Sequence, residues 1–168
     1  DIPDFATSSN NEANGGLLVL AENLVLNNLN ISGSSQVYVE GKASVTIGGT
    51  ASLVASGASL ELIDGTGSDQ TVLSLAGNLD VQGSLKVAGS NAKVDLNGYK
   101  LKIVGTLDNN GVIEDGTVSF DNPGGSATLT GTGDLPNVEV TKSGSATTLQ
   151  LNATQDINGS LTVNGVIS

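Results

Sequence analysis

The side chains that could carry out chemistry in this sequence are carboxylates and lysines, because it contains no Arg, His or Cys. Seventeen Asp and Glu residues against six Lys give a net charge of −11. Most enzymes draw their general bases, nucleophiles and stabilisers of negative charge from a wider set of groups. We expect a protein that is no enzyme, with no catalytic residues, no cofactor and no metal ligands.

Two groups of acidic residues have spacings that invite comparison with known sites. Glu114 and Asp115 are adjacent, so on a strand they should face opposite ways, whereas the two carboxylates of a glycosidase converge on the substrate. Asp64 and Asp69 flank a Gly-Thr-Gly-Ser loop that could place two oxygens near a cation. Calcium takes six to eight oxygen ligands, and this loop lacks EF-hand spacing. We interpret these residues as solvated acids at turns and leave weak calcium binding near Asp64 and Asp69 open.

The lysines and glycines do not favour a phosphate or nucleic-acid site. Lys100 and Lys102 lie on the same side of one expected strand, where their simplest role is to solubilise an outer face. The glycine pairs at 124–125 and 131–133 begin no helix and contain no Gly-Lys-Ser/Thr, so we interpret them as corners. The strongly negative charge argues against nucleic acid as a partner.

Threonine and serine on the outer faces raise the alternative of a flat array that binds carbohydrate or ice. Thr46, Thr128, Thr130 and Thr162 do not recur at one fixed position of the pattern. A monomeric adhesin or a carbohydrate- or ice-binding module is therefore the alternative hypothesis for the function.

The elements that carry these residues are repeated along the chain. Residues 73–89 (LSLAGNLDVQGSLKVAG) recur 76 positions later as residues 149–165 (LQLNATQDINGSLTVNG), with identical residues at eight positions. A third copy begins near residue 18, where LVLAENL matches LSLAGNL. Self-similarity of this kind indicates an array of stacked units.

Short alternating runs bounded by Gly, Asn, Asp and Ser fill the chain from Leu17 onward, and they predict strands of three to five residues. Turn signals about every seven or eight residues favour a single parallel β-solenoid with an aliphatic core. At about 20 residues a turn, this gives about seven rungs. A β-sandwich of the jelly-roll kind is the alternative fold. The repeat further predicts that Leu85 and Leu161 are buried at equivalent positions of different rungs.

Three segments carry a resemblance to a known family: DLNGYKLKIVGTLDNNGVIEDGTVSF (95–120), LTGTGDLPNVEVTKSG (129–144) and residues 149–165. They resemble the β-helical repeats of bacterial extracellular and surface-adhesin proteins, of the filamentous-haemagglutinin-like type. The resemblance implies a right-handed parallel β-helix at the cell surface. It implies no particular activity, because such repeats serve as stalks, fibres and passengers.

The ends of the chain suggest a domain organisation. Residues 1–16 are polar and predict an N-terminal arm or cap, and residues 17–168 predict the solenoid, with internal repeats starting near residues 18, 73 and 149. No run approaches the roughly 18 apolar residues of a membrane span. A chain that starts with Asp fits a mature secreted protein, so we expect an extracellular or cell-surface location.

Repeat sequence at both ends predicts self-assembly. A solenoid exposes unpaired strand edges at its first and last rungs, and two such edges from different copies are complementary. We expect a structural subunit of a filament that assembles head to tail, with copies of itself as partners and a surface polysaccharide as a further partner. The residues expected at the interface are apolar: Ile2, Phe5, Leu17, Leu18, Leu20, Leu161, Val163, Val166 and Ile167.

Overall fold

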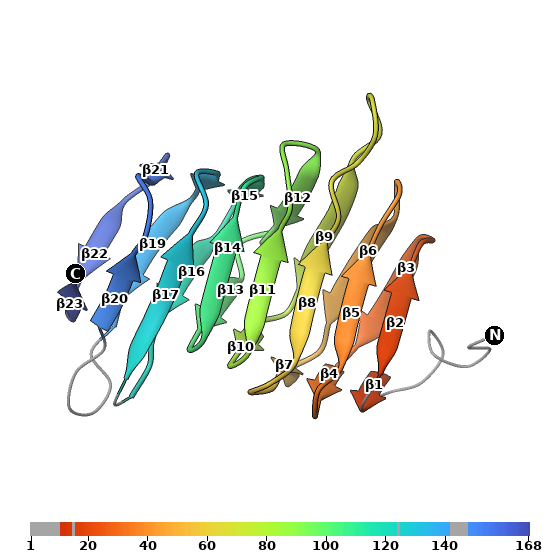
Figure 1. The fold of residues 1–168 in the computed structure, drawn as a ribbon, viewed down its shortest axis with the longest axis horizontal. Helices are drawn as coiled ribbons and strands as arrows, with labels where there is room; N and C mark the ends of the chain where they lie inside the picture. Colours follow the sequence, from red (N-terminus) through yellow and green to blue (C-terminus); the bar gives the residue numbers. More distant parts are fainter. Residues whose placement is uncertain (1–10, 15, 124, 142–147) are drawn as a thin grey trace.

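The chain folds into a coil of short strands, and every third strand belongs to the same sheet (Figure 1). The computed structural model describes residues 11–14, 16–123, 125–141 and 148–168, which contain 23 strands and no helix. The strands form three parallel sheets, here named A, B and C.

Sheet A consists of β1 (Asn11–Asn14), β4 (Leu29–Ser32), β7 (Ser52–Val54), β10 (Leu79–Val81), β13 (Lys100–Ile103), β16 (Thr117–Phe120), β19 (Asn137–Val140) and β22 (Leu161–Val163). Sheet B consists of β2 (Leu17–Leu20), β5 (Gln36–Val39), β8 (Ser59–Leu62), β11 (Ser84–Val87), β14 (Thr106–Asn109), β17 (Ser126–Thr130), β20 (Thr148–Leu151) and β23 (Val166–Ile167). Sheet C consists of β3 (Leu24–Asn27), β6 (Ser44–Gly48), β9 (Thr71–Ala76), β12 (Ala92–Asp95), β15 (Val112–Glu114), β18 (Asp134–Leu135) and β21 (Asp156–Ile157).

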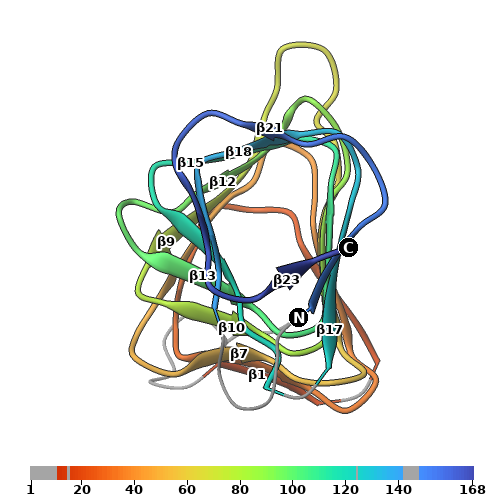
Figure 2. The same ribbon diagram turned by 90° about the vertical axis from the view of Figure 1, so that its left-hand side faces the viewer.

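The winding is right-handed. Seen from the C-terminal end in Figure 2, the chain passes from sheet A to sheet B to sheet C anticlockwise while it advances toward the viewer. All strand pairs among the described residues are parallel. The predicted solenoid of about seven rungs is thus confirmed, and the jelly-roll alternative, which requires antiparallel pairs, is wrong.

The core consists of columns of aliphatic side chains that run along the coil. Alternate residues of each strand point inward, and equivalent inward residues of successive rungs lie in register. In sheet B, for example, Leu60, Leu85, Leu107 and Leu129 form one column, and all four are buried. Phe120 is the one aromatic residue among the buried residues described. An interior this narrow needs no large side chains, which accounts for the aliphatic composition.

Asparagines at the corners hold neighbouring rungs together. Their side-chain oxygens accept hydrogen bonds from backbone N–H groups about one rung later: Asn23 from Ser44, Asn28 from Thr50, Asn78 from Lys100 and Asn137 from Ser160, at 2.9–3.0 Å. The Asn137 Nδ2 also donates to the Gly116 carbonyl of the preceding rung at 3.0 Å. Because corner backbone groups have no ladder partner, these amides satisfy donors and acceptors that would otherwise be lost.

The two copies of the repeat do not occupy equivalent strands, contrary to the prediction. Residues 73–89 cover strands of sheets C, A and B in that order, whereas residues 149–165 cover strands of sheets B, C and A. Leu85 is therefore a fully buried residue of sheet B, and Leu161 lies in sheet A and is 50% exposed. The predicted equivalence of these two residues is wrong, because corners of unequal length shift the second copy by one sheet.

The first strand lies within the stretch assigned to the N-terminal arm. β1 (Asn11–Asn14) pairs with β4 in register, with Asn11 opposite Leu29. Ile2 and Phe5 lie outside the described residues.

Candidate functional site

The C-terminal end of the coil exposes an apolar edge, which we call the C-edge: β21, β22 and β23, the last strands of the three sheets (Figure 1). Leu161 and Val163 of β22 lie in register with the buried Val138 and Val140 of β19, so their side chains face the inside of the coil. No rung covers them in the described chain. The exposed fractions of the apolar side chains here are 50% for Leu161, 44% for Val163, 48% for Val166 and 37% for Ile167, and Leu151 at the end of the neighbouring β20 is 38% exposed.

The backbone of the C-edge is poised to accept another strand. The Asn164 N–H donates to the Val140 carbonyl of β19 at 2.8 Å. Because successive residues of a parallel strand direct their N–H and C=O groups to opposite neighbours, Leu161 and Val163 direct theirs away from β19. The same argument applies to the other two sheets, where Asn158 bonds to Leu135 and Ser168 to Leu149. Ile157 and Ile167 therefore also present their backbone groups to the open side.

The N-terminal end of the coil carries the complementary pattern in β2 and β3. The Asn28 N–H donates to the Gly48 carbonyl at 3.1 Å, so Val25 directs its backbone groups away from β6. In β2, the Leu20 carbonyl accepts from Glu40 at 3.1 Å, so Val19 likewise directs its backbone groups outward. The Val19 and Val25 side chains are 42% and 59% exposed.

The first and last rungs contribute side chains to the same inward-facing columns. In sheet C, Leu24 of β3 and Ile157 of β21 are the first and last residues of one inward column, and both are partly buried against the core. Of the residues predicted at the interface, Leu20 is buried, Val166 occupies an outward column with Thr148, and Leu161, Val163 and Ile167 lie on the C-edge. The side chains of Leu17 and Leu18, like Ile2 and Phe5, lie outside what the structure describes.

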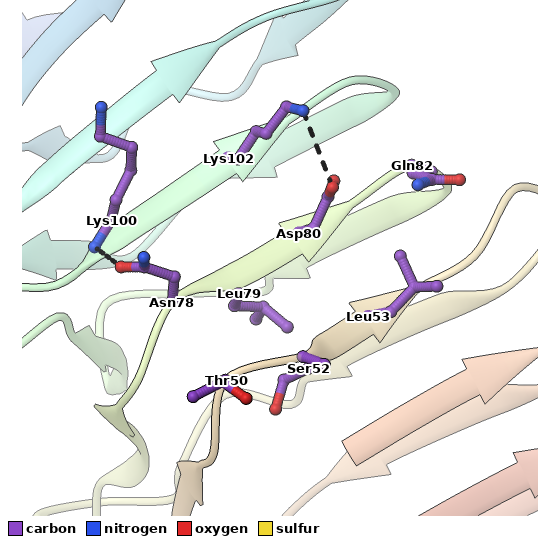
Figure 3. Close-up of a pocket in the computed structure, with 10 residues that line it drawn as sticks. Thr50, Ser52, Leu53, Asn78, Leu79, Asp80, Gln82, Lys100 and Lys102 are labelled. Atoms are coloured by element: carbon purple, nitrogen blue, oxygen red, sulfur yellow. Dashed lines mark hydrogen bonds and ion pairs between the residues drawn. The ribbon is translucent and has the colours of Figure 1, made fainter. Parts of the chain in front are cut away.

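A second feature is a groove of about 400 Å³ on the outer face of sheet A, between β7, β10 and β13 (Figure 3). Leu53 and Thr50 line one side, and Asn78, Asp80 and Gln82 follow along β10 and its ends. Figure 3 shows Asp80 directed toward Lys102 of the next strand, with the Asp80 Oδ2 and Lys102 Nζ 3.8 Å apart.

Asp80 is the most distinctive group of this groove. Its Oδ1 is buried and has no hydrogen-bond partner among the described residues. A buried carboxylate oxygen normally has one, so the groove retains an acceptor for a hydroxyl or amide donor. Asp80 was not predicted as a site residue; the signal for it in the sequence is its recurrence in the repeat as Asp156.

Ion pairs link successive rungs on the outer faces, except that the pair of Lys100 with Glu139 joins strands two rungs apart, β13 and β19. The pairs are Lys86 with Glu61 at 2.7 Å, Lys93 with Glu114, Lys100 with Glu139, and Lys102 with Asp80 and Asp121 at 3.8 and 3.6 Å. Hydrogen bonds to Glu61 and Glu114 raise the pKa values of Lys86 and Lys93, respectively. The hydrogen bond from Lys100, followed by one from Ser119, lowers the pKa of Glu139. Lys100 and Lys102 thus point outward, as predicted.

One group of carboxylates converges within the described chain. Oxygens of Asp95, Glu114 and Asp115 lie within 4.8 Å of one another. The expectation that Glu114 and Asp115 face opposite ways is wrong, because β15 ends at Glu114 and Asp115 adopts a left-handed corner conformation with φ +56°. Glu114 is already paired with Lys93, and three carboxylates are fewer than the ligands calcium takes, so we assign no metal to this group.

Asp64 accepts a hydrogen bond from the Asn91 N–H at 2.7 Å, which connects its loop to the next rung.

The described residues include no helix long and apolar enough to cross a membrane. Comparison with protein-family models, with curated proteins and with solved structures finds no match to this chain. The parallel β-solenoid is therefore established by the structure itself.

Proposed function

We propose that the protein is a non-enzymatic structural subunit of an extracellular or cell-surface filament, in which copies stack head to tail. The observation that carries the proposal is the C-edge, where inward-facing Leu161, Val163 and Ile167 are one-third to one-half exposed. Their backbone groups point along the coil axis toward the position of a further rung.

The complementarity of the two ends supports this assembly. At the C-edge the inward-facing residues direct their backbone N–H and C=O groups toward a following copy. At the N-terminal end the outward-facing Val19 and Val25 direct theirs toward a preceding copy. Parallel stacking of two copies joins these sets in the pattern found between rungs inside the coil. A head-to-tail contact that does not close into a ring generates a filament.

The outer faces support a filament rather than a bundle. Lys86, Lys93, Lys100 and Lys102 pair with carboxylates of other rungs, and the chain has a net charge of −11. Like charge on the flanks opposes side-by-side association, while strand pairing and apolar burial act along the axis. The resemblance of residues 95–165 to bacterial surface-adhesin repeats supports the location outside the cell.

The substitution Val163→Pro tests the proposal. Proline removes an N–H group that points to the open edge and leaves the bonds of β22 to β19 in place. We expect wild-type chains to form filaments visible by electron microscopy, and V163P to remain monomeric with an unchanged far-UV spectrum. Val163→Ala, which keeps the N–H group, is the matched control and should still assemble at a higher critical concentration. A wild-type chain that sediments as a monomer at all concentrations would exclude the filament.

The groove on sheet A favours a second function, binding of a polyhydroxylated ligand such as a surface polysaccharide. The unpartnered Asp80 Oδ1 and the flanking Asn78, Gln82 and Lys102 offer acceptors and donors around the apolar side chain of Leu53. Hydroxyl-rich ligands are recognised by such convergent polar groups beside a small apolar surface.

Titration with short neutral and acidic oligosaccharides, followed by calorimetry, tests this second function. Asp80→Asn should weaken binding about tenfold, because the amide replaces one acceptor oxygen with a donor. Asp108→Asn on the outer face of sheet B is the control for the lost charge and should bind like the wild type. Equal affinity of all three proteins would exclude the groove as the binding site.

A further inference from the structure

The outer face of sheet A carries a column of side chains that lie in register from rung to rung. The column runs through Asn30 of β4, Leu53 of β7, Asp80 of β10 and Lys102 of β13. Among the described residues, three buried side-chain polar atoms have no hydrogen-bond partner, and two of them belong to this column: Asn30 Oδ1 and Asp80 Oδ1. These two residues flank Leu53, and their strands lie two rungs, or about 10 Å, apart.

The continuation of the same column is satisfied within the chain. The Ser119 hydroxyl shares a hydrogen bond of 3.3 Å with the Thr141 hydroxyl, and Glu139 is paired with Lys100. The acceptors without a partner are therefore confined to the part of the column around Leu53. Because a buried acceptor without a donor is unfavourable, this part of the column is suited to a ligand that supplies two donors.

Both side chains can present their oxygens to a ligand. The Asp80 side chain is 34% exposed and Asn30 is half-buried, although one oxygen of each is covered. The terminal torsion of Asn and Asp is broad, so rotation about χ2 brings the oxygen toward the surface. Leu53 lines the groove between them, and its neighbours Ala51 and Ala55 are short. A ligand can thus cross β7 over Leu53 without meeting a larger side chain of that rung.

The charges around the groove favour a neutral ligand. Lys100 and Lys102 also line the groove, but both are already paired with carboxylates. With a net charge of −11 on the chain, an acidic ligand would be repelled. A neutral sugar ring has apolar faces and hydroxyls at its edges, so it can pack on Leu53 while it donates to the oxygens on either side.

We propose that the groove binds a neutral polysaccharide whose chain lies along the coil axis, over Leu53, with hydroxyls donated to Asp80 on one side and to Asn30 on the other. The inference rests on the proposed carbohydrate function of the groove and adds Asn30 as a second anchor. The strands of the two anchors are about 10 Å apart, farther than a single sugar ring reaches. Only a chain of linked units therefore engages both anchors, and a monosaccharide engages Asp80 alone.

The dependence of affinity on chain length tests this inference. The probes are neutral linear oligosaccharides of glucose, mannose and N-acetylglucosamine, from the monosaccharide to the hexasaccharide, titrated by calorimetry. For the wild type, affinity should rise about tenfold or more once the chain spans both anchors. Asn30→Ala should abolish this rise, whereas Asp80→Asn should weaken binding at every length. Asn30→Asp retains the acceptor oxygen and is the matched control, which should bind within about twofold of the wild type. Far-UV spectra of the three variants should match that of the wild type.

The outcomes separate this inference from the carbohydrate function of the groove. Hexasaccharide binding that depends on Asp80 and not on Asn30 would overturn the inference and leave the groove as a carbohydrate site. Tighter binding of an oligogalacturonate than of every neutral hexasaccharide would overturn the neutral ligand. If none of the oligosaccharides binds, or if D80N binds all of them like the wild type, the inference and the carbohydrate function are both excluded.

Discussion

At the residue scale, two glycines with the same backbone conformation have different surroundings. Gly98 and Gly131 have φ values of +82° and +85°. A Cβ on Gly98 would meet open space, whereas one on Gly131 would overlap the carbonyl oxygen of Asn109 in the preceding rung. Gly98→Ala should cost about 1–2 kcal/mol of unfolding free energy, from the left-handed conformation alone. Gly131→Ala should cost about 1–3 kcal/mol more, measured by urea denaturation, and equal losses would contradict the close approach of the rungs.

Glu139 is the residue whose ionisation should affect stability in acid. Its pKa is lowered in the folded chain by Lys100, so its contribution is present above the ordinary Glu pKa of roughly 4.3 and is lost as pH falls through the lowered value. Glu139→Gln should be less stable than the wild type by about 0.2–1 kcal/mol at pH 7, because the pair is partly exposed. The difference in urea midpoints should shrink below about pH 4. Glu40→Gln, at an exposed corner, controls for the lost charge.

At the scale of elements, the alternation of apolar and polar residues predicted the strands well. In a narrow parallel coil every second residue of a strand faces the core, so this alternation is the pattern that the fold requires. The register was not predictable from the repeat. The connections from a sheet B strand to the next sheet A strand, each of which includes a sheet C strand, differ in length, as residues 131–136 and 63–78 show. A shift by one strand places Leu161 in a different sheet from Leu85. The groove could not be predicted from the sequence either. It is formed by residues of successive rungs, and in the sequence Asp80 does not differ from other outward-facing residues of strands.

Leu85 and Leu161 now provide a matched comparison between a central and a terminal rung. Leu85→Ala removes a fully buried side chain with rungs on both sides and should cost about 2–5 kcal/mol. Leu161→Ala removes a side chain that is 50% exposed and should cost about 1 kcal/mol in the monomer. Thermal or urea unfolding of the monomers measures both, and a similar loss at the two positions would show that the C-edge is already covered in solution.

At the scale of the whole molecule, composition predicted a thin aliphatic core and a protein with few groups for chemistry, and repetition predicted the coil. The surfaces that we assign to function arise only from the three-dimensional winding. Whether a residue such as Leu161 lies inside the coil or at its edge depends on the rungs stacked on either side of it. The eight, eight and seven strands described in the three sheets cannot be read from any single segment.

Amide hydrogen exchange should report assembly residue by residue, because alternate amides of the last rung have different partners. In the monomer, Asn164 and Ser168 donate to β19 and β20 at 2.8 and 2.9 Å, and their amides should be protected. The amides of Leu161 and Val163 point to the open edge and should exchange rapidly. Stacking of a further rung gives these two amides partners and should slow their exchange in filaments, while the protection of Asn164 changes little. Protection of Leu161 and Val163 in dilute monomer, or its absence in filaments, would show that another contact holds the copies together.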